Sequence, residues 1–231
     1  MVSNFFGKKA VVVGGSGGIG LPLARLLKNS GADVHIIGRH EVSGFKSTVI
    51  DLDVPENMVD VINIVSIADI LVLARGPFLQ KPLHETSPQD WQQIVYANTL
   101  LPSILISSAL NNQCESSWGR ILVLGGTRTD TIQGFRTNAA YGAAKTALSS
   151  LVKSVALSYG YIGIRCNAVC PGFVDTEYID FEQKKNLAKK NPDGKLISVE
   201  EIAAAGFFLL ENPVFNGVLL PVDKGWVPSF I

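Results

Sequence analysis

Charged residues are scarce in this sequence, and neither sign is in excess. Of the 231 residues, 17% are charged, and 20 basic residues balance 20 acidic ones. A protein that binds DNA or RNA normally carries a basic excess or a basic stripe, so we expect no nucleic-acid partner. Because 47% of the residues are apolar, the chain can bury enough surface to fold rather than stay disordered.

Long apolar runs are also missing. No uninterrupted apolar stretch approaches the roughly 18 to 20 residues that a membrane-spanning helix needs, although the mean hydropathy is positive. A parallel sheet buried on both faces would account for that hydropathy. The first apolar segment, 10–13, is short and runs into glycines, unlike a signal peptide. We expect a cytoplasmic protein with no membrane partner.

Cysteine is rare and odd in number, with Cys114, Cys166 and Cys170 as its three occurrences. An odd count disfavours a disulfide framework. Cys166 and Cys170 have neither a second cysteine pair nor a histidine pair nearby, as a zinc site would require. We therefore expect small core residues and no bound metal.

Strand-sized apolar runs alternate with amphipathic stretches along the whole chain. Ser87 and Pro88 are a typical cap and first residue of a helix. Strands are expected at 9–14, 33–38, 47–51, 69–74, 120–124, 163–169 and 217–222, and helices at 18–30, 88–113 and 138–159. This alternation predicts one α/β domain over 1–231 with a doubly wound parallel sheet. Ligands of such sheets bind at the carboxyl ends of the strands.

A glycine-rich loop joins the first strand to the first helix, in the order Gly14-Gly15-Ser16-Gly17-Gly18-Ile19-Gly20. Glycines allow backbone N–H groups to approach a diphosphate, and the following helix N-terminus adds partial positive charge. A flexible loop is the alternative explanation. The strand before it and the helix after it favour dinucleotide binding.

The spacing of Gly14, Gly18 and Gly20 resembles that of the short-chain dehydrogenase/reductase family, with Val13 where the family usually has threonine. Further matching segments are 53–54, 82–83, Trp91 with Asn98, 141–145, 167–176 and 220–223. The chain is most similar to the single-domain branch that includes the β-ketoacyl carrier-protein reductases. The resemblance implies a Rossmann-type, three-layer α/β/α fold with a seven-stranded sheet. It implies the following cofactor-binding residues: Gly14, Ser16, Gly17, Gly18, Ile19, Gly20, Arg39, Asp53, Val54, Ala74, Gly76, Tyr141, Lys145, Pro171, Gly172, Val174 and Thr176.

The end of the second strand bears on the choice between NAD and NADP. An acidic residue there would bind the ribose 2′-hydroxyl of NAD, whereas a basic residue would receive the 2′-phosphate of NADP. This chain has Gly38, Arg39 and His40, and a guanidinium suits phosphate geometry. We expect NADP to be preferred, with NAD as the alternative. By the resemblance, Asp53 would contact the adenine amino group.

Tyr141 and Lys145 are four residues apart, so they share one face of a helix. An ammonium beside a phenol stabilises the phenolate and lowers the tyrosine pKa, which makes tyrosine usable as an acid or base. The pair resembles the family's catalytic Tyr-x-x-x-Lys, and a solvated helix face is the alternative. Asn98 matches the family asparagine that supports a water leading to the lysine.

Two segments depart from the family pattern. The family usually has a serine after the fifth strand, but no serine occurs between Trp118 and Tyr141. Counting from the strand places Gly126 at that position, whereas counting back from Tyr141 places Arg128 there. Thr127 is the nearest hydroxyl and our candidate for a fourth catalytic residue, with Thr129 second.

The other departure is the segment 73–76, Leu-Ala-Arg-Gly, where the family usually has Asn-Asn-Ala-Gly. Arg75 could pair with a cofactor phosphate or form an ion pair elsewhere. A lysine-rich segment at about 177–197 matches the family's variable substrate lid. The family usually assembles through its two long helices, so we expect a homodimer or homotetramer.

Two functional hypotheses follow. The first is an NADP(H)-dependent oxidoreductase that transfers hydride between nicotinamide and a small carbonyl or alcohol substrate. The second, motivated by the missing serine and the altered segment 73–76, is a nucleotide-binding protein with little or no dehydrogenase activity.

Overall fold

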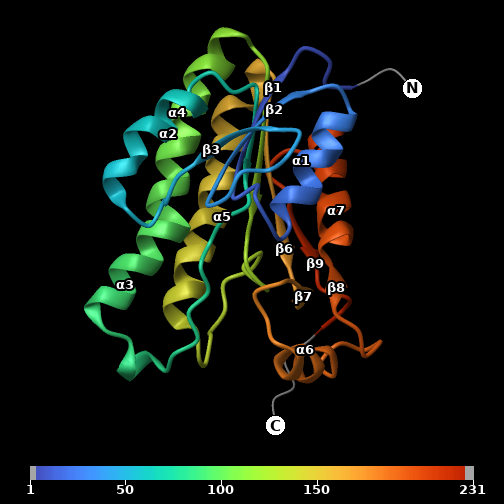
Figure 1. The fold of residues 1–231 in the computed structure, drawn as a ribbon. Coiled ribbons are helices and arrows are strands. Elements are labelled where there is room, and N and C mark those ends of the chain that lie inside the picture. The colour runs from blue at the N-terminus through green and yellow to red at the C-terminus, as the bar shows by residue number, and fades with distance from the viewer. Residues whose placement is uncertain (1–3, 227–231) are drawn as a thin grey trace.

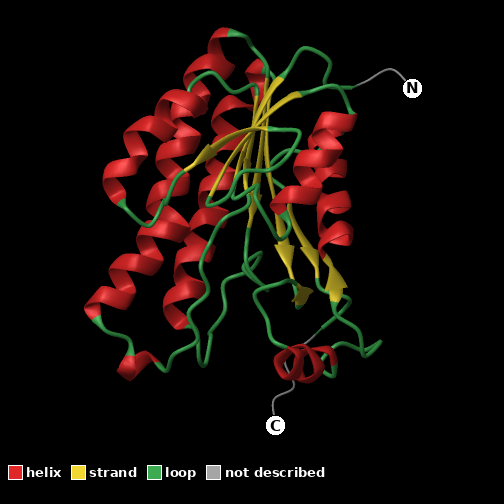
Figure 2. Cartoon of the chain, viewed as in Figure 1, coloured by secondary structure: helices red, strands yellow, loops and turns green. Residues whose placement is uncertain are grey.

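The computed structural model describes residues 4–226, and a seven-stranded parallel sheet forms its centre (Figures 1 and 2). The strands follow the spatial order β3-β2-β1-β4-β5-β6-β9, and every neighbouring pair is parallel. Their bounds are β1 (Lys9–Val13), β2 (Asp33–Gly38), β3 (Lys46–Val49), β4 (Ile70–Leu73), β5 (Gly119–Leu124), β6 (Ile164–Pro171) and β9 (Leu219–Val222). This arrangement confirms the expected doubly wound fold.

Helices cover both faces of the sheet, which gives the three layers visible in Figure 2. One face is covered by α2 (Met58–Val65), α4 (Leu101–Glu115) and α5 (Ala139–Tyr159), and the other by α1 (Gly20–Asn29) and α7 (Val199–Glu211). Along β1, Val11 and Val13 join the first hydrophobic cluster, whereas Ala10 and Val12 join the second. Because successive side chains point to opposite faces, a strand covered on both sides must be apolar throughout. This explains the positive mean hydropathy.

The long helix expected over 88–113 is broken into three parts. It comprises α3 (Pro88–Val95), a π-helical segment (Tyr96–Leu100) and α4. Pro102 lies in the first turn of α4 and has no N–H to bond the carbonyl four residues earlier, so the helix widens locally. The widened segment carries Asn98, which is fully buried.

Among the described residues, the continuous helical stretch Pro88–Glu115 is long and apolar enough to cross a membrane by length and composition alone. Of its most apolar window, 56% is buried inside the structure. Leu105, Ile106 and Ala109 of this stretch belong to the hydrophobic core. Its apolar character therefore serves packing against the sheet.

Several elements were not expected from the sequence. Helices α2 and α7 were missed, as was the two-stranded sheet of β7 (Val174–Asp175) and β8 (Ile197–Ser198). Helix α6 (Phe181–Ala188) lies within the lysine-rich segment at about 177–197. Short 3-10 turns occur at Pro55–Asn57, Leu83–Glu85 and Gly160–Ile162. In Figure 1, β7 and α6 lie together at the lower edge of the molecule. They therefore lie beyond the carboxyl end of β6, where a ligand is expected.

Candidate active site

Two glycines of the loop between β1 and α1 are required by close backbone contacts. Gly14 has a φ of +82°, and a Cβ atom there would lie 2.9 Å from the carbonyl carbon of Ala74. A Cβ atom on Gly20 would lie 2.2 Å from the carbonyl oxygen of Gly14. No side chain can be accommodated at either place. The sequence pattern therefore reflects a tightly folded turn rather than a merely flexible loop.

This turn presents backbone N–H groups to an anion. The amide of Gly18 donates a hydrogen bond of 2.9 Å to a carboxylate oxygen of Glu177. A carboxylate in this position stands in for a phosphate oxygen, since both are anions that accept from N–H groups at a helix N-terminus. The glycine loop thus fits the diphosphate of a dinucleotide.

The adenosine end of the expected site contains a serine, an arginine and an acidic residue. The Ser16 hydroxyl packs against Gly38, so a Cβ atom added to Gly38 would lie 2.4 Å from Ser16 Oγ. Arg39, the next residue after Gly38, is exposed. Asp53 is exposed and forms an ion pair with Arg75. Of the two roles considered for Arg75, the structure shows the ion pair. The cation holds Asp53 at the position expected to receive adenine.

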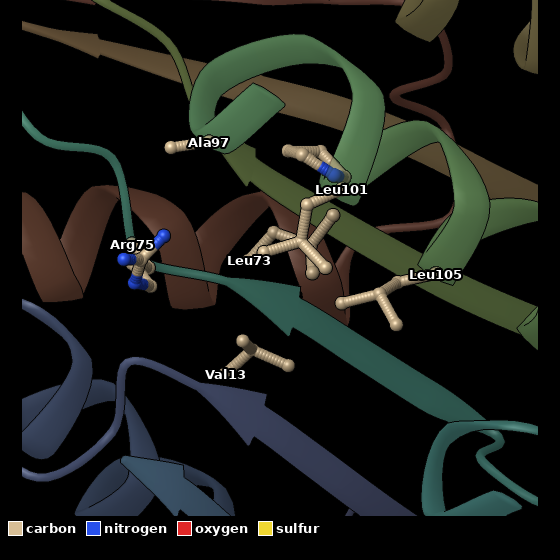
Figure 3. Close-up of a pocket in the computed structure, with 7 residues that line it drawn as sticks. Val13, Leu73, Arg75, Ala97, Leu101 and Leu105 are labelled. Carbon is tan, nitrogen blue, oxygen red and sulfur yellow. The ribbon is translucent and has the colours of Figure 1, made fainter. Parts of the chain in front are cut away.

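Arg75 lies next to a small apolar cavity, drawn in Figure 3. Val13 and Leu73 both line it, and they are direct partners in the pairing of β1 with β4. These are the positions where the family usually has threonine and asparagine. Both side chains are buried, at 2% and 4% exposure. Val13 and Leu73 are therefore a matched change, because two neighbouring positions that are usually polar in the family are both apolar here.

The cavity itself has a volume of about 10 Å³, which is the size of about one water molecule. Its remaining lining comes from the π-helical segment and α4, and Leu101 and Leu105 face Leu73 across it (Figure 3). It is too small to hold a substrate or a cofactor. Val13 and Leu73 are therefore closely packed against α4 at this point of the sheet.

Tyr141, Lys145 and Asn98 converge at the carboxyl ends of β4 and β5. A Cβ atom added to Gly76 would lie 2.5 Å from Asn98 Oδ1 and 2.7 Å from Lys145 Nζ. The Lys145 ammonium donates to the carbonyl oxygen of Leu124 at 2.7 Å and lies 5.9 Å from the centre of the Tyr141 ring. Gly76 is thus the position where only glycine leaves room for these groups.

Asn98 is held by its amide and leaves its carbonyl oxygen available. Nδ2 donates to the backbone oxygens of Pro77 and Ile94, each at 3.1 Å. Its Oδ1 is buried and has no hydrogen-bond partner among the described residues. A buried acceptor of this kind is normally satisfied by an ordered water or a ligand. The orphaned oxygen points to the region of the Lys145 ammonium.

Burial dominates the electrostatics of Tyr141 and Lys145. Desolvation lowers the pKa of Lys145 to about 8. It raises the pKa of Tyr141 above its usual range, with a further contribution from Cys170. The expected lowering of the tyrosine pKa is not found here, because the ammonium bonds the Leu124 carbonyl rather than the phenol. Tyr141 is therefore protonated at neutral pH.

The position of the missing serine is settled by the neighbours of Gly126. A Cβ atom there would lie 3.0 Å from Cε1 and 3.1 Å from the hydroxyl oxygen of Tyr141. Counting from the strand is thus correct, and Gly126 faces the phenol. The Thr127 hydroxyl donates to the backbone oxygen of Pro171 at 2.9 Å. The hydroxyl of the buried Thr129 donates to the backbone oxygen of Gly126 at 2.9 Å.

A family model described as enoyl-(acyl carrier protein) reductase matches residues 14–227 of the chain. The match runs from the glycine loop through the tyrosine and lysine to the last strand. The chain belongs to the short-chain dehydrogenase/reductase family. Its three-layer fold and glycine loop are those expected for the family.

Curated family relatives are similar over nearly the full length. The chain is 28% identical to D-beta-hydroxybutyrate dehydrogenase of Rhizobium meliloti, covering 95% of this chain and 98% of the relative. It is 29% identical to a 3-oxoacyl-(acyl carrier protein) reductase of Rickettsia typhi, covering 96% and 98%. These family relatives are oxidoreductases that act on hydroxyl or carbonyl groups.

Solved structures of the family show the same fold. One described as a short chain dehydrogenase/reductase family protein superposes with a TM-score of 0.86 at 30% identity, covering 96% of this chain and 98% of the other. An NAD(P)-dependent gluconate 5-dehydrogenase from Beutenbergia cavernae, solved with bound NADP, has a TM-score of 0.87 at 26% identity, covering 99% and 100%.

The segment that the family resemblance assigns to nicotinamide binding lies at the end of β6. Pro171 ends that strand, Val174 begins β7 and Thr176 follows β7. A Cβ atom on Gly172 would lie 2.8 Å from Cα of Asp223. These residues border the Tyr141 region because Thr127 bonds Pro171.

Sequence reasoning missed three residues that contact this family site. The Phe78 ring lies edge-on to that of Tyr141, with ring centres 5.0 Å apart. Glu177 and Tyr178, taken as the start of a variable lid, contact the glycine loop. Their position after the matching segment 167–176 was the available signal. Among the described residues, no group of three or more His, Cys, Asp or Glu side chains could hold a metal ion.

Proposed function

We propose that this chain is an NADP(H)-dependent oxidoreductase that interconverts a small carbonyl compound and its alcohol. The observation that carries the proposal is the convergence of Tyr141, Lys145 and Asn98 beside a glycine loop that binds an anion. A bound nicotinamide would supply or accept the hydride. The residues of the chain would then have to bind the cofactor, position the substrate oxygen and move one proton.

Tyr141 holds the proton that the substrate oxygen receives on reduction. Its raised pKa keeps the hydroxyl protonated at neutral pH, which suits proton donation to a developing alkoxide. Phe78 packs edge-on against the ring and fixes its orientation. The phenol would lie between the substrate oxygen and the Lys145 ammonium.

Lys145 and Asn98 return a proton to the tyrosine. The ammonium has a pKa of about 8 because it is desolvated, so it can release a proton near neutral pH. The orphaned Oδ1 of Asn98 and the Lys145 ammonium both border Gly76. A water held between them would connect the pair to solvent.

Arg39 supports the preference for NADP over NAD. It is exposed at the end of β2, no acidic residue stands at that strand end, and its guanidinium can bind a phosphate by two hydrogen bonds. The related gluconate 5-dehydrogenase structure contains NADP. Gly14–Gly20 would hold the diphosphate, and Asp53, fixed by Arg75, would receive the adenine.

Because glycine stands at position 126, where the family usually has serine, the substrate oxygen would have one hydrogen-bond donor fewer. The Thr127 hydroxyl is engaged with Pro171, so Thr127 supports the nicotinamide-binding segment rather than replacing the serine side chain. Removal of one such donor lowers the rate by about 10²–10³-fold in well-studied enzymes. We therefore expect a slow enzyme whose substrate oxygen depends chiefly on Tyr141.

The test is NADPH oxidation with a panel of aldehydes, ketones and carrier-bound 3-oxoacyl compounds. The proposal requires turnover with at least one class. Tight NADPH binding without turnover on any of them would instead support the nucleotide-binding hypothesis. The relatives point to hydroxy acids and sugar acids, assayed by reduction of NADP⁺, and to 3-oxoacyl thioesters, assayed by oxidation of NADPH, as first choices.

We also propose a homodimer or homotetramer that assembles through α3–α4 and α5. Val95, Leu100 and Leu157 are large apolar side chains on this surface, with exposures of 40%, 49% and 86%. Such side chains are typical of an interface between copies. Light scattering coupled to size exclusion would measure the mass of the assembly.

We also propose that the protein is cytoplasmic, since Cys114, Cys166 and Cys170 are all free thiols.

A further inference from the structure

The turn after β7 lies directly over the glycine loop. β7 ends at Asp175 and α6 begins at Phe181, and we call the connecting residues 176–180 the strap. One end is anchored by the pairing of β7 with β8. The other is anchored by a capping box in which Asp180 accepts from the amide of Gln183. The strap tip is therefore a short connection fixed on both sides.

Two side chains of the strap occupy the anion site. The carboxylate of Glu177 accepts from the Gly18 amide at 2.9 Å. A Cβ atom on Gly17 would lie 2.6 Å from Glu177 Oε1 and 2.8 Å from the Tyr178 hydroxyl. The strap thus covers the two glycines at which a diphosphate would approach the backbone.

The surroundings of the two strap side chains determine their charge. Burial raises the pKa of the Tyr178 hydroxyl, and so does the Glu177 carboxylate, while the Arg39 guanidinium opposes them. For the Glu177 carboxyl, burial alone would raise the pKa. Hydrogen bonds from its own amide, Gly18 and Tyr178 outweigh burial and hold the pKa below its usual range. The carboxylate is consequently charged at neutral pH and stays bound to the loop.

We propose that the strap is an internal competitor of the cofactor: Glu177 occupies the diphosphate position and Tyr178 covers Gly17 until NADPH displaces both. This inference rests on the proposed function only in taking the glycine loop as the diphosphate site. A carboxylate and a phosphate oxygen cannot accept from the same N–H group at the same place. The apparent affinity for NADPH is then reduced by the fraction of molecules in which the strap is closed.

The experiment measures NADPH binding by fluorescence to the full chain and to Glu177→Gln. The substitution keeps the side-chain size but replaces a charge-assisted hydrogen bond by a weaker neutral one. We expect the Kd for NADPH to fall about threefold to tenfold, as for a strap that is closed most of the time. Glu182→Gln is the matched control, because Glu182 is an exposed carboxylate on α6 outside the strap.

Stopped-flow kinetics distinguish a strap that competes with NADPH in the free protein from a Glu177 side chain that contacts NADPH in the complex. A strap closed only in the free protein slows association, so Glu177→Gln should raise the association rate constant and leave the dissociation rate constant unchanged. Adenosine 2′-monophosphate, which has no diphosphate, should bind both proteins with similar affinity.

The remaining outcomes would overturn either the strap proposal or the proposed function. An unchanged or higher Kd in Glu177→Gln, or a gain matched by Glu182→Gln, overturns the strap. A gain that arises entirely from slower dissociation also overturns it, because the residue would then act in the complex. If neither wild type nor variant binds NADPH while both remain folded by circular dichroism, the proposed function itself fails.

Discussion

Lys145 is predicted to reduce the stability of the fold that holds it. The side chain is 2% exposed, and desolvation lowers its pKa from 10.5 to about 8. The unfolded chain therefore binds more protons than the folded chain between about pH 8 and pH 10.5, so stability rises with pH across that interval. Below pH 8 both states are protonated and the full penalty for burying the ammonium applies.

Replacing Lys145 by methionine removes that penalty while conserving the side-chain length. The pKa difference corresponds to about 3 kcal/mol at pH 7. Losing the hydrogen bond from the ammonium to the Leu124 carbonyl costs about 2 kcal/mol in return, because its donor is charged. Lys145→Met should therefore be more stable than wild type by about 1 kcal/mol at pH 7, which raises the Tm by roughly 2 to 4 °C in a chain of this length.

The assay is thermal and urea unfolding between pH 7 and pH 10.5 without nucleotide, accompanied by a turnover measurement. The stability advantage of Lys145→Met should shrink as the pH rises above 8 and reverse before pH 10.5, because the lost hydrogen bond to Leu124 then has no penalty to offset it. The variant should have no turnover. Lys153→Met is the control, since Lys153 is exposed on the same helix. A variant less stable than wild type by the same amount at every pH would refute this reasoning.

Three further substitutions test the site. Gly20→Ala places a Cβ 2.2 Å from the Gly14 carbonyl oxygen; we expect loss of NADPH binding and a destabilisation of about 2 kcal/mol, and calorimetry showing normal binding would contradict it. Arg39→Ala should weaken NADPH binding about tenfold or more while sparing NADH; equal losses for both would remove Arg39 from phosphate recognition. Gly126→Ser restores a donor beside Tyr141 and should raise kcat by up to about 10²–10³-fold. Gly126→Ala adds the same Cβ without the hydroxyl, so equal rates in the two Gly126 variants would show that the donor does not act.

Local patterns were sufficient to predict the sheet and the outline of the site. Strands buried on both faces consist of continuous apolar runs, and the glycine loop has a fixed spacing, so β1, the turn and α1 could be placed within a few residues. The relation between Val13 and Leu73 could not be, because it depends on the register between two strands far apart in sequence. The sequence shows only that each position departs from the family pattern, and the pairing of the strands shows that the two apolar side chains are neighbours.

The protonation states were also beyond sequence reasoning. The spacing of Tyr141 and Lys145 correctly placed them together, but the ammonium bonds a backbone carbonyl from β5, and burial then decides both pKa values. The role of Glu177 was hidden for a similar reason. It follows a recognisable segment, yet its contact with Gly18 spans 159 positions of the chain. Contacts between distant segments determine which groups are charged and which positions are covered.

The central claim is that Tyr141 delivers the proton in an NADPH-dependent carbonyl reduction. The most direct measurement compares wild type and Tyr141→Phe for NADPH binding and for NADPH oxidation with the best substrate of the panel. We expect the variant to bind NADPH with unchanged affinity and to have no measurable turnover. Turnover retained in Tyr141→Phe at a rate near that of wild type would contradict it.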